Sequence, residues 1–445
     1  MTNDVELAAS KPSSENIVDG RALTSDELKV LTDMNQHYSH TVIGGKHRIM
    51  TYKPCPVDGV RMTFERINDF FNNYAHKPKV ATKNQGQAWF QWEGKAFYSN
   101  GIGYYPNSLK LPKGVFNTFQ GFGCKPKAGD VNLIMKHINE VLCDGNGEAA
   151  KYFIEWLAHI VQYPEVKPTV AILMKSAEGT GKGTIYKLLK KMLGANAHQV
   201  NGSYQLMGRF NGIVAGRLLI FGDEVDMTDK KSFDRAKGII SEPTISLELK
   251  GIDPEPIPNM ARFMFAGNHD QVIVAGTRER RFLVLEIAEH IIGNRDYFKS
   301  LNHQIDNGGA PAFLAYLQSI DLKDFDPYKA PATKGLIAEK LIGLPSAYAY
   351  IHRELSQPRP FEGKVRITAP DLISSFRSWA SENGDLKVTE PSARSKIGKL
   401  MNALNIKSIG RSDRGNGKIY ELPSIDDFKA RFAKRLDHEV DEVFY

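Results

Sequence analysis

The chain has 445 residues, of which 42% are hydrophobic and 24% are charged, values close to those of soluble globular proteins. This length permits two or three domains with a sizeable core, and the composition argues against a large disordered region. The formal net charge of +7 suits a polyanionic partner, although a few surplus lysines on an ordinary surface would give the same value.

Cysteine usage and the N-terminal residues bear on the cellular compartment. Cys55, Cys124 and Cys143 are far apart and show no C-x-x-C spacing, so neither a disulfide scaffold nor a zinc site is indicated. Residues 1–14 contain no apolar signal-peptide core, and no apolar run reaches membrane-spanning length. We therefore expect a cytoplasmic protein, in a bacterial host or an equivalent compartment, with no membrane partner.

The N-terminal part is predicted to contain a flexible tail and an accessory domain. Residues 1–20 are rich in Ser, Asn and acidic residues, which is typical of a tail. Residues 21–126 begin with a helix-start pattern at Thr24 and then alternate short apolar stretches with Gly, Pro and Asn, which favours an α+β domain. Its clustered aromatic residues suit base stacking or core packing, and core packing is the more common use.

The remainder of the chain divides into four predicted parts. Residues 127–166 keep helical spacing on both sides of a glycine-containing break and predict a helical collar of two helices. Residues 167–295 alternate strands and helices, which indicates an α/β motor, and residues 296–355 are predicted to be mostly helical. Pro and Gly residues at 356–363 predict a linker into a basic domain that extends over 356–445.

A glycine-rich turn stands between a predicted buried strand and a predicted helix, the context that a phosphate-binding loop requires. The glycines let backbone N–H groups face phosphate oxygens, and Lys182 can reach the β- and γ-phosphates. The loop departs from the pattern G-x-x-x-x-G-K-[ST] at two positions: Ser176 stands in place of the first Gly, and Gly183 stands in place of the final Ser or Thr. Because that final residue normally supplies the magnesium-binding hydroxyl, Thr184 or Thr180 could supply it here. An ordinary turn before a helix is the alternative interpretation. The predicted nucleotide-binding residues are Glu178, Gly179, Thr180, Gly181, Lys182, Gly183 and Thr184.

Two carboxylates, Asp223 and Glu224, end the next predicted buried strand. The carboxyl end of a central strand faces the ligand crevice of an open α/β sheet. In that place Asp223 would hold Mg²⁺ together with Thr184, and Glu224 would polarise the attacking water. Such a strand end commonly just reaches solvent, but its position downstream of a phosphate loop favours the functional interpretation.

A polar amide and a pair of arginines complete the predicted catalytic set. Asn268 ends a third buried strand and can orient a water near the γ-phosphate, with a turn-forming Asn as the alternative. Arg281 and Arg280 precede a further β-run, and a guanidinium suits the charge that develops on a transferring phosphoryl group. Arg281 is preferred over Arg280, and a solvated charge cluster is the alternative. The ordered occurrence of these elements predicts an ATPase.

In this order, the motifs resemble those of the superfamily 3 helicases of viruses and mobile elements, above all the helicase part of phage and poxvirus-type primase-helicases. The resemblance is carried by residues 178–184, 208–211, 220–224, 247–251, 265–268 and 280–282, and it covers 125–290 well. The resemblance implies an AAA+-like P-loop ATPase core and a hexameric ring of identical subunits. It also implies ATP and Mg²⁺ as cofactors and 3′→5′ movement on single-stranded DNA. In a ring, the arginine finger comes from the neighbouring subunit.

The resemblance also implies a DNA-binding hairpin that lines the central channel. Residues 245–259 occupy that place, with Lys250 near the tip, where a solvated Lys at a turn is the alternative. Lys237, on the predicted short helix before this hairpin, matches a further basic position of the family, although less clearly than Lys250 does. Residues 1–125 contain no convincing D-x-D metal site, so priming, if it is needed, is expected from a separate primase or polymerase or from a segment outside this sequence.

The C-terminal segment reads as a helix, a basic helix and a basic hairpin, the order of a winged helix-turn-helix. Phosphate contacts would supply its affinity for DNA, while a basic cap that never contacts DNA is the alternative. The candidate DNA-binding residues are Arg394, Lys396, Lys399, Arg411 and Arg414.

The sequence as a whole predicts an ATP-dependent replicative DNA helicase of a virus, phage or mobile element. Its fold class would be α/β, with an AAA+-like core, a helical collar, an N-terminal α+β domain and a C-terminal winged-helix-like domain. Single-stranded and forked DNA are the expected partners. The first alternative is a replication initiator or loader that uses ATP as a switch without unwinding, and the second is a P-loop enzyme that acts on small molecules.

Overall fold

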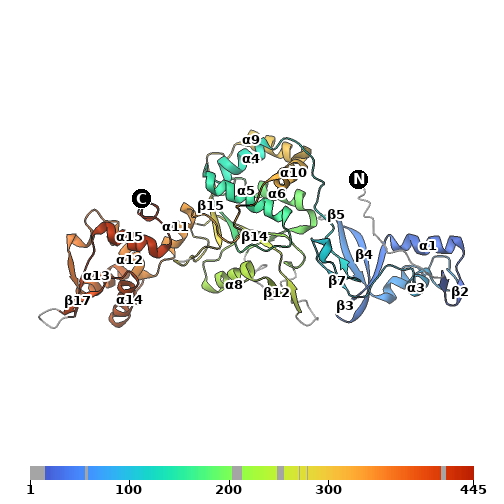
Figure 1. The fold of residues 1–445 in the computed structure, drawn as a ribbon, viewed down its shortest axis with the longest axis horizontal. Helices are drawn as coiled ribbons and strands as arrows, with labels where there is room; N and C mark the ends of the chain where they lie inside the picture. The colour runs from blue at the N-terminus through green and yellow to red at the C-terminus, as the bar shows by residue number, and fades with distance from the viewer. Residues whose placement is uncertain are drawn as a thin grey trace. The chain divides into compact units, whose positions relative to one another are not determined.

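The computed structural model describes residues 16–55, 59–202, 213–247, 255–269, 271–277, 279–411 and 417–444 (Figure 1). The chain divides into two compact units. The first comprises the residues up to Gly123 together with Leu193–Asn196, and the second comprises Cys124–Met192, Ala197–Leu247 and the residues from Glu255 onward.

The first unit is built on a four-stranded sheet with the order β5-β4-β3-β6. Its elements are β1 (Ile17–Val18), β2 (Arg21–Ala22), α1 (Ser25–Asn35), β3 (Tyr38–Ile43), β4 (Lys46–Cys55), β5 (Gly59–Glu65), α2 (Ile67–Asn72), α3 (Gln85–Gln91), β6 (Phe97–Tyr98), β7 (Ile102–Gly103), η1 (Ser108–Lys110) and β8 (Phe116–Asn117). Helix α1 begins at a capping box between Thr24 and Glu27, as the helix-start pattern predicted. The core joins Leu31 of α1, Phe70 of α2 and Trp89 of α3 with strand residues. Of the clustered aromatic residues, Trp89 and Trp92 are buried in this core and Phe90 packs against it.

The second unit begins with the two helical segments predicted for the collar. The first is α4 (Asn132–Lys136), which continues into a π-helical turn, η2 (His137–Leu142). The second is α5 (Gly147–Gln162), which Asn146 caps by accepting a hydrogen bond from the Ala149 N–H. The break between them falls at the predicted Asp144–Gly147 turn.

The centre of this unit is a five-stranded sheet with the order β10-β11-β14-β9-β15, in which all neighbouring strands are parallel. The strands are β9 (Ala171–Lys175), β10 (Ala197–Asn201), β11 (Leu219–Asp223), β14 (Arg262–Gly267) and β15 (Phe282–Glu286). Helices α5 and α6 (Lys182–Leu193) lie on one side of the sheet, and α8 (Lys230–Ser241) lies on the other (Figure 1). Burial on both faces explains the near-continuous apolar strands, and the α/β class with a parallel sheet is confirmed.

Two arms of a hairpin follow α8, at the place where the sequence predicted one. They are β12 (Thr244–Leu247) and β13 (Glu255–Pro258), which pair in antiparallel register. The tip with Lys250 lies outside the described residues.

The segment after β15 is mostly helical, as predicted. It contains α9 (Arg295–Gln304), a π-helical turn η4 (Ile305–Gly309), α10 (Ala310–Ser319) and α11 (Lys334–Ile342). Gln162 at the end of α5 donates hydrogen bonds to the carbonyls of Leu317 and Ile320, both at 2.8 Å, and so fixes α10 against the collar. Within the described residues, no helix has the combination of length and apolarity that crossing a membrane requires.

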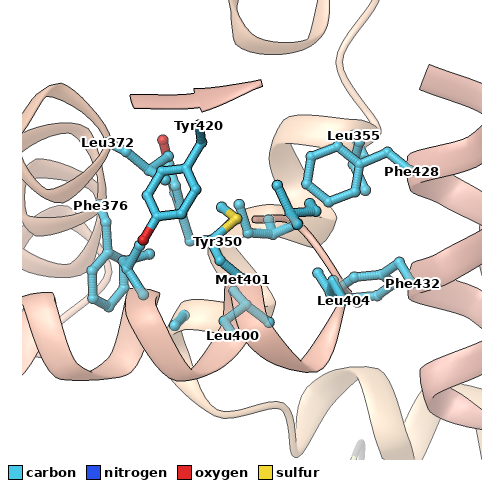
Figure 2. Close-up of a cluster of buried hydrophobic side chains, with 14 of the residues drawn as sticks. Tyr350, Leu355, Leu372, Phe376, Leu400, Met401, Leu404, Tyr420, Phe428 and Phe432 are labelled. Atoms are coloured by element: carbon cyan, nitrogen blue, oxygen red, sulfur yellow. The ribbon is translucent and has the colours of Figure 1, made fainter. Parts of the chain in front are cut away.

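The C-terminal elements surround a core of their own, part of which Figure 2 shows. They are α12 (Ser346–Leu355), η5 (Pro360–Gly363), β16 (Arg366–Thr368), α13 (Ala369–Glu382), α14 (Glu390–Ala403), β17 (Ser408–Arg411), β18 (Lys418–Glu421), α15 (Ile425–Leu436) and α16 (Val440–Val443). The three-stranded sheet has the order β16-β18-β17, so the predicted basic hairpin pairs back onto the strand before α13.

Residues 346–363 differ from the sequence interpretation. Tyr350 and Leu355 of α12 pack in the C-terminal core, although α12 was assigned to the preceding helical extension (Figure 2). Phe361, inside the predicted linker, is 4% exposed and stacks on Phe428 with ring centroids 5.6 Å apart. The Pro and Gly residues therefore mark a turn inside this core and not a flexible boundary.

Candidate nucleotide-binding site

A cavity of about 440 Å³ opens at the carboxyl edge of the parallel sheet. It is lined by Glu178, Gly179, Thr180, Gly181, Lys182, Gly183, Thr184, Asp223, Glu224, Ala266, Gly267, Asn268 and Phe298. The structure thus brings together every residue predicted to bind the nucleotide or the metal, with Glu224 and Asn268 of the predicted catalytic set. The reason is topological: β9, β14 and β11 are adjacent and parallel, so the residues after them meet at one edge.

The loop between β9 and α6 has the backbone of an anion-binding turn. Gly179 and Gly181 have φ values of +80° and +96°, a region that side chains other than glycine rarely adopt. The loop is fixed to the sheet where the Ser176 N–H donates to the Gly267 carbonyl at 3.2 Å. Helix α6 then starts at Lys182, so its unpaired N–H groups and positive dipole end face the cavity.

Lys182 lies half-buried among the acidic groups of this cavity. Its Nζ donates to the Ser176 carbonyl at 3.0 Å and lies 3.5 Å from that of Gly267. Burial lowers the pKa of Lys182, and the carboxylates of Asp223, Glu178 and Glu224 act in the opposite direction. The ammonium group is therefore held by carbonyl oxygens that a phosphate group could replace.

The acidic pair ends β11 at the cavity. The Asp223 carboxylate accepts a hydrogen bond from the Glu224 N–H at 3.2 Å, and a second from the Gln199 side chain at 3.4 Å. Glu224 is exposed and has a φ of +52°, a left-handed backbone that is unusual for a residue with a side chain. The next residue still bonds to the neighbouring strand, because the Val225 N–H donates to the Ala266 carbonyl of β14 at 3.0 Å.

The oxygen-rich chemistry of the cavity fits Mg²⁺ better than a transition metal. Among the described residues there is no group of three or more His, Cys, Asp or Glu that could hold a metal alone. Mg²⁺ uses one or two protein carboxylates and takes its other ligands from water and substrate phosphates. Asp223 and Glu224, beside the hydroxyl of Thr184, match that requirement.

The two candidate hydroxyls differ in their surroundings. Thr180 is fully buried, and its hydroxyl lies 2.6 Å from the Ser176 hydroxyl and donates to the Ala177 carbonyl at 3.2 Å. Thr184 is only partly buried, in the first turn of α6. The Thr180 hydroxyl is thus engaged in hydrogen bonds within the loop, whereas Thr184 is partly exposed and lines the cavity, which favours Thr184 as the metal ligand.

Two further residues contribute to this region, and sequence reasoning missed both. Phe298 of α9 lines the cavity directly. His137 of η2 is 2% exposed, and its Nδ1 lies 3.0 Å from the hydroxyl oxygen of Tyr297. They come from helices outside the ordered motifs, and no spacing pattern in the sequence indicated them.

The two predicted arginines do not line the cavity of their own chain. The Arg281 guanidinium donates to the Ser241 hydroxyl at 2.8 Å and lies 3.5 Å from the Glu279 carboxylate. Arg280 is exposed. The structure therefore leaves their assignment as fingers for a neighbouring subunit a prediction.

The predicted DNA-binding residues fall into three groups. Lys250 and Arg414 lie outside the described residues. Arg394, Lys399 and Arg411 are exposed, with Arg394 ion-paired to Glu390 on the same helix.

The remaining two lysines make contacts within the chain. Lys237 forms an ion pair of 2.6 Å with Asp234, and its Nζ lies 4.7 Å from the centre of the Phe233 ring. Lys396 donates to the Ser346 hydroxyl at 3.1 Å and lies 3.5 Å from the Asp385 carboxylate, so it ties α14 to α12. Lys396 is therefore the weakest of the C-terminal candidates.

A family profile matches the region of this cavity, and one phage protein is similar in sequence to part of the chain. Residues 174–281 match the profile of a family of unknown function (DUF5906), an interval that begins at the end of β9 and ends at Arg281. The chain is also 27% identical over 191 residues to the "DNA Primase-polymerase" of Nitratiruptor phage NrS-1, which covers 42% of this chain. The aligned part spans about a quarter, 26%, of the length of that relative.

Two solved structures of the C-terminal region of NrS-1 share the fold. An apo structure has a TM-score of 0.64 at 18% identity and covers 90% of this chain and 99% of that one. A second structure, the A form, has a TM-score of 0.62 at 17% identity, with coverage of 89% and 98%. At this level of identity the likeness concerns the fold alone.

Proposed function

We propose that this chain is the ATP-driven motor of a phage DNA replication protein, a ring-forming helicase that translocates 3′→5′ on single-stranded DNA. One observation carries the proposal: Lys182, Asp223 and Asn268 reach a single cavity from the ends of three adjacent parallel strands. The similarity to a phage DNA primase-polymerase supports a role in phage DNA replication.

The loop would hold the phosphates of ATP. Their oxygens would accept hydrogen bonds from the loop N–H groups and the N-terminus of α6, and Lys182 would move from the Ser176 carbonyl to the β- and γ-phosphates. Mg²⁺, held by Asp223 and the Thr184 hydroxyl, would supply neutralising charge on the same phosphates. An open pocket of about 440 Å³ has room for these groups.

Hydrolysis requires an oriented water and stabilisation of the transferring group. The exposed Glu224 carboxylate would accept the proton of the attacking water, and the Asn268 amide would fix its position next to the γ-phosphate. Arg281, or Arg280 in its place, would reach the cavity of the adjacent copy in a hexamer and stabilise the developing charge. Their position outside the cavity of their own chain is compatible with that role.

The connection from the cavity to DNA would run through α8, β12 and β13. This segment follows β11, which ends at Asp223, and precedes β14, which ends next to Asn268. A change at the γ-phosphate would therefore act on both ends of the hairpin, whose Lys250, together with Lys237, would contact the DNA backbone. The basic C-terminal elements would hold further DNA, and a separate primase or polymerase would supply primers.

Strand displacement on forked DNA tests the proposal. The purified chain with ATP and Mg²⁺ should release the labelled strand from a fork with a 3′ tail faster than from one with a 5′ tail. Lys182→Ala should abolish both hydrolysis and displacement. Lys191→Ala is the matched control, because Lys191 lies on the same helix but is ion-paired with Asp306 at 2.7 Å, away from the cavity.

The outcomes separate the alternatives. Hydrolysis that depends on Lys182 without strand displacement would favour an ATP-switched initiator or loader. A chain that neither binds nor hydrolyses ATP would refute the motor altogether. Mass measurement with single-stranded DNA and a non-hydrolysable nucleotide should give a hexamer, and a monomer under those conditions would contradict the ring.

A further inference from the structure

A buried histidine lies directly against the loop of the candidate nucleotide site. His137 is the first residue of the π-helical turn η2 and is 2% exposed. Its Nδ1 lies 3.0 Å from the Tyr297 hydroxyl on α9, and its ring is 6.4 Å from that of Phe298, which lines the cavity. The imidazole is thus fixed from α9 on one side and faces the loop on the other.

The contact with the loop is made at Gly181. A Cβ atom added to Gly181 would lie 2.7 Å from Cε1 and 3.1 Å from Nε2 of His137, and 2.9 Å from the Phe298 ring. Gly181 also has a φ of +96°, in the left-handed region. Two independent constraints, backbone conformation and lack of space, therefore require glycine at the position where the loop passes over the imidazole.

The helix that carries His137 is irregular at this point. Helix α4 is regular up to Lys136, and the π-helical turn begins with His137 itself. Single π-helical turns are rare and occur frequently at functional sites. His137 itself keeps α-helical angles (φ −60°, ψ −42°) and its N–H donates to the Leu133 carbonyl, so α4 delivers the imidazole and the irregular turn follows it.

The protonation state of His137 agrees with a supporting role. Burial lowers the pKa of His137 to about 4, while the Gly181 backbone acts in the opposite direction. At neutral pH the ring is therefore uncharged and has one donor and one acceptor nitrogen. It can exchange a hydrogen bond with Tyr297 without adding a charge beside Lys182.

We propose that His137, held by Tyr297, is a positioning residue that braces Gly181 and keeps the phosphate loop open for a triphosphate. The inference rests on the proposed function, because it assigns a role at the same cavity. A preformed loop does not have to be ordered when the ligand binds, so its affinity for nucleotide is higher than that of a loop free to collapse. Loss of the brace should therefore weaken nucleotide binding more than the chemical step.

The test compares nucleotide affinity, KM, kcat and thermal midpoint among variants. His137→Ala should weaken the binding of a fluorescent ATP analogue and raise KM by about tenfold, with kcat changed by less than about threefold. His137→Gln, which keeps a donor and an acceptor, should recover most of the affinity. Tyr297→Phe should lose about threefold, because it removes the tether and leaves the ring in place.

A matched control is available in His159 of α5. It is also buried, 5% exposed, and its ring lies 3.2 Å from the Arg262 guanidinium at the start of β14, but unlike His137 it is not among the nearest neighbours of Gly181. His159→Gln should leave nucleotide affinity at the wild-type value. If His137→Ala does not fold, His137→Leu takes its place, because it keeps bulk in the core but can exchange no hydrogen bond with Tyr297, and it should lose at least as much affinity as Tyr297→Phe.

Failure of the inference is distinguishable from failure of the proposed function. If wild-type protein binds the nucleotide and Lys182→Ala does not, but the His137 and Tyr297 variants bind as wild type, the brace is refuted and the motor stands. Equal losses of stability in the His137 and His159 variants, with unchanged affinity in both, would likewise reduce His137 to a core residue. Absence of nucleotide binding by the wild-type chain would overturn both proposals.

Discussion

In the candidate nucleotide cavity, a lysine, three carboxylates and an amide come from three stretches of the sequence and face one volume of about 440 Å³. In the C-terminal elements, Arg394, Lys399 and Arg411 are exposed on one helix and one hairpin. The first arrangement depends on the geometry of a parallel sheet, so one substitution should disable it. The second acts through the sum of surface charges, so each substitution should have a graded effect.

The largest effect is expected from Glu224→Gln in the candidate nucleotide cavity. It removes the carboxylate that would take the proton of the attacking water, so kcat should fall by roughly a hundred- to ten-thousandfold. Nucleotide binding, measured by fluorescence titration, should be retained. A variant that keeps more than a tenth of wild-type turnover would show that Glu224 is not the base.

Phe428→Ala tests whether the two regions are separable. Phe428 is fully buried in the C-terminal core (Figure 2), and its ring stacks on that of Phe361. Its truncation should cost about 3–5 kcal/mol of unfolding free energy in denaturant titration. We expect the variant to bind DNA more weakly, because its C-terminal core is destabilised, and to hydrolyse ATP in the absence of DNA as fast as wild type. Loss of both DNA binding and ATP hydrolysis would show that the two regions depend on each other.

Thr184→Ala should have an intermediate effect. Loss of one magnesium-binding hydroxyl should raise the Mg²⁺ concentration at half-maximal hydrolysis by about tenfold. Thr180→Ala is the comparison, because its hydroxyl bonds to Ser176 and Ala177 inside the loop. Thr180→Ala should reduce stability and nucleotide affinity without changing the Mg²⁺ concentration at half-maximal hydrolysis. If Thr180→Ala and not Thr184→Ala raises that concentration, Thr180 is the metal ligand.

The smallest effect is expected from removing exposed basic side chains of the C-terminal elements. Lys399→Ala with Arg411→Ala should weaken DNA binding several-fold and lower the slope of log affinity against log salt by about 2, one per phosphate contact. Lys396→Ala is the control, since its ammonium is held by Ser346 and Asp385. An unchanged salt slope in the double variant would mean that this surface does not contact DNA.

The sequence was most informative where residues follow the rules of parallel sheets. Asp223, Glu224 and Asn268 could be placed together because each ends a buried strand, and such ends meet at one edge. His137 and Phe298 could not be foreseen, because their place depends on how helices before and after the sheet pack against the loop. The expected linker failed for a similar reason: Pro and Gly predict a turn, but only packing shows that Phe361 enters a core.

The left-handed backbone of Glu224 has a consequence for how this site can change. A residue with a Cβ in this region is less stable than glycine by roughly 1–2 kcal/mol, so on backbone grounds alone the position favours Gly or Asn. Laboratory evolution under heat selection alone should therefore enrich replacements of Glu224. Selection that also demands nucleotide turnover should keep the carboxylate, and the opposing outcomes would make this position a marker of the trade-off between heat resistance and catalysis.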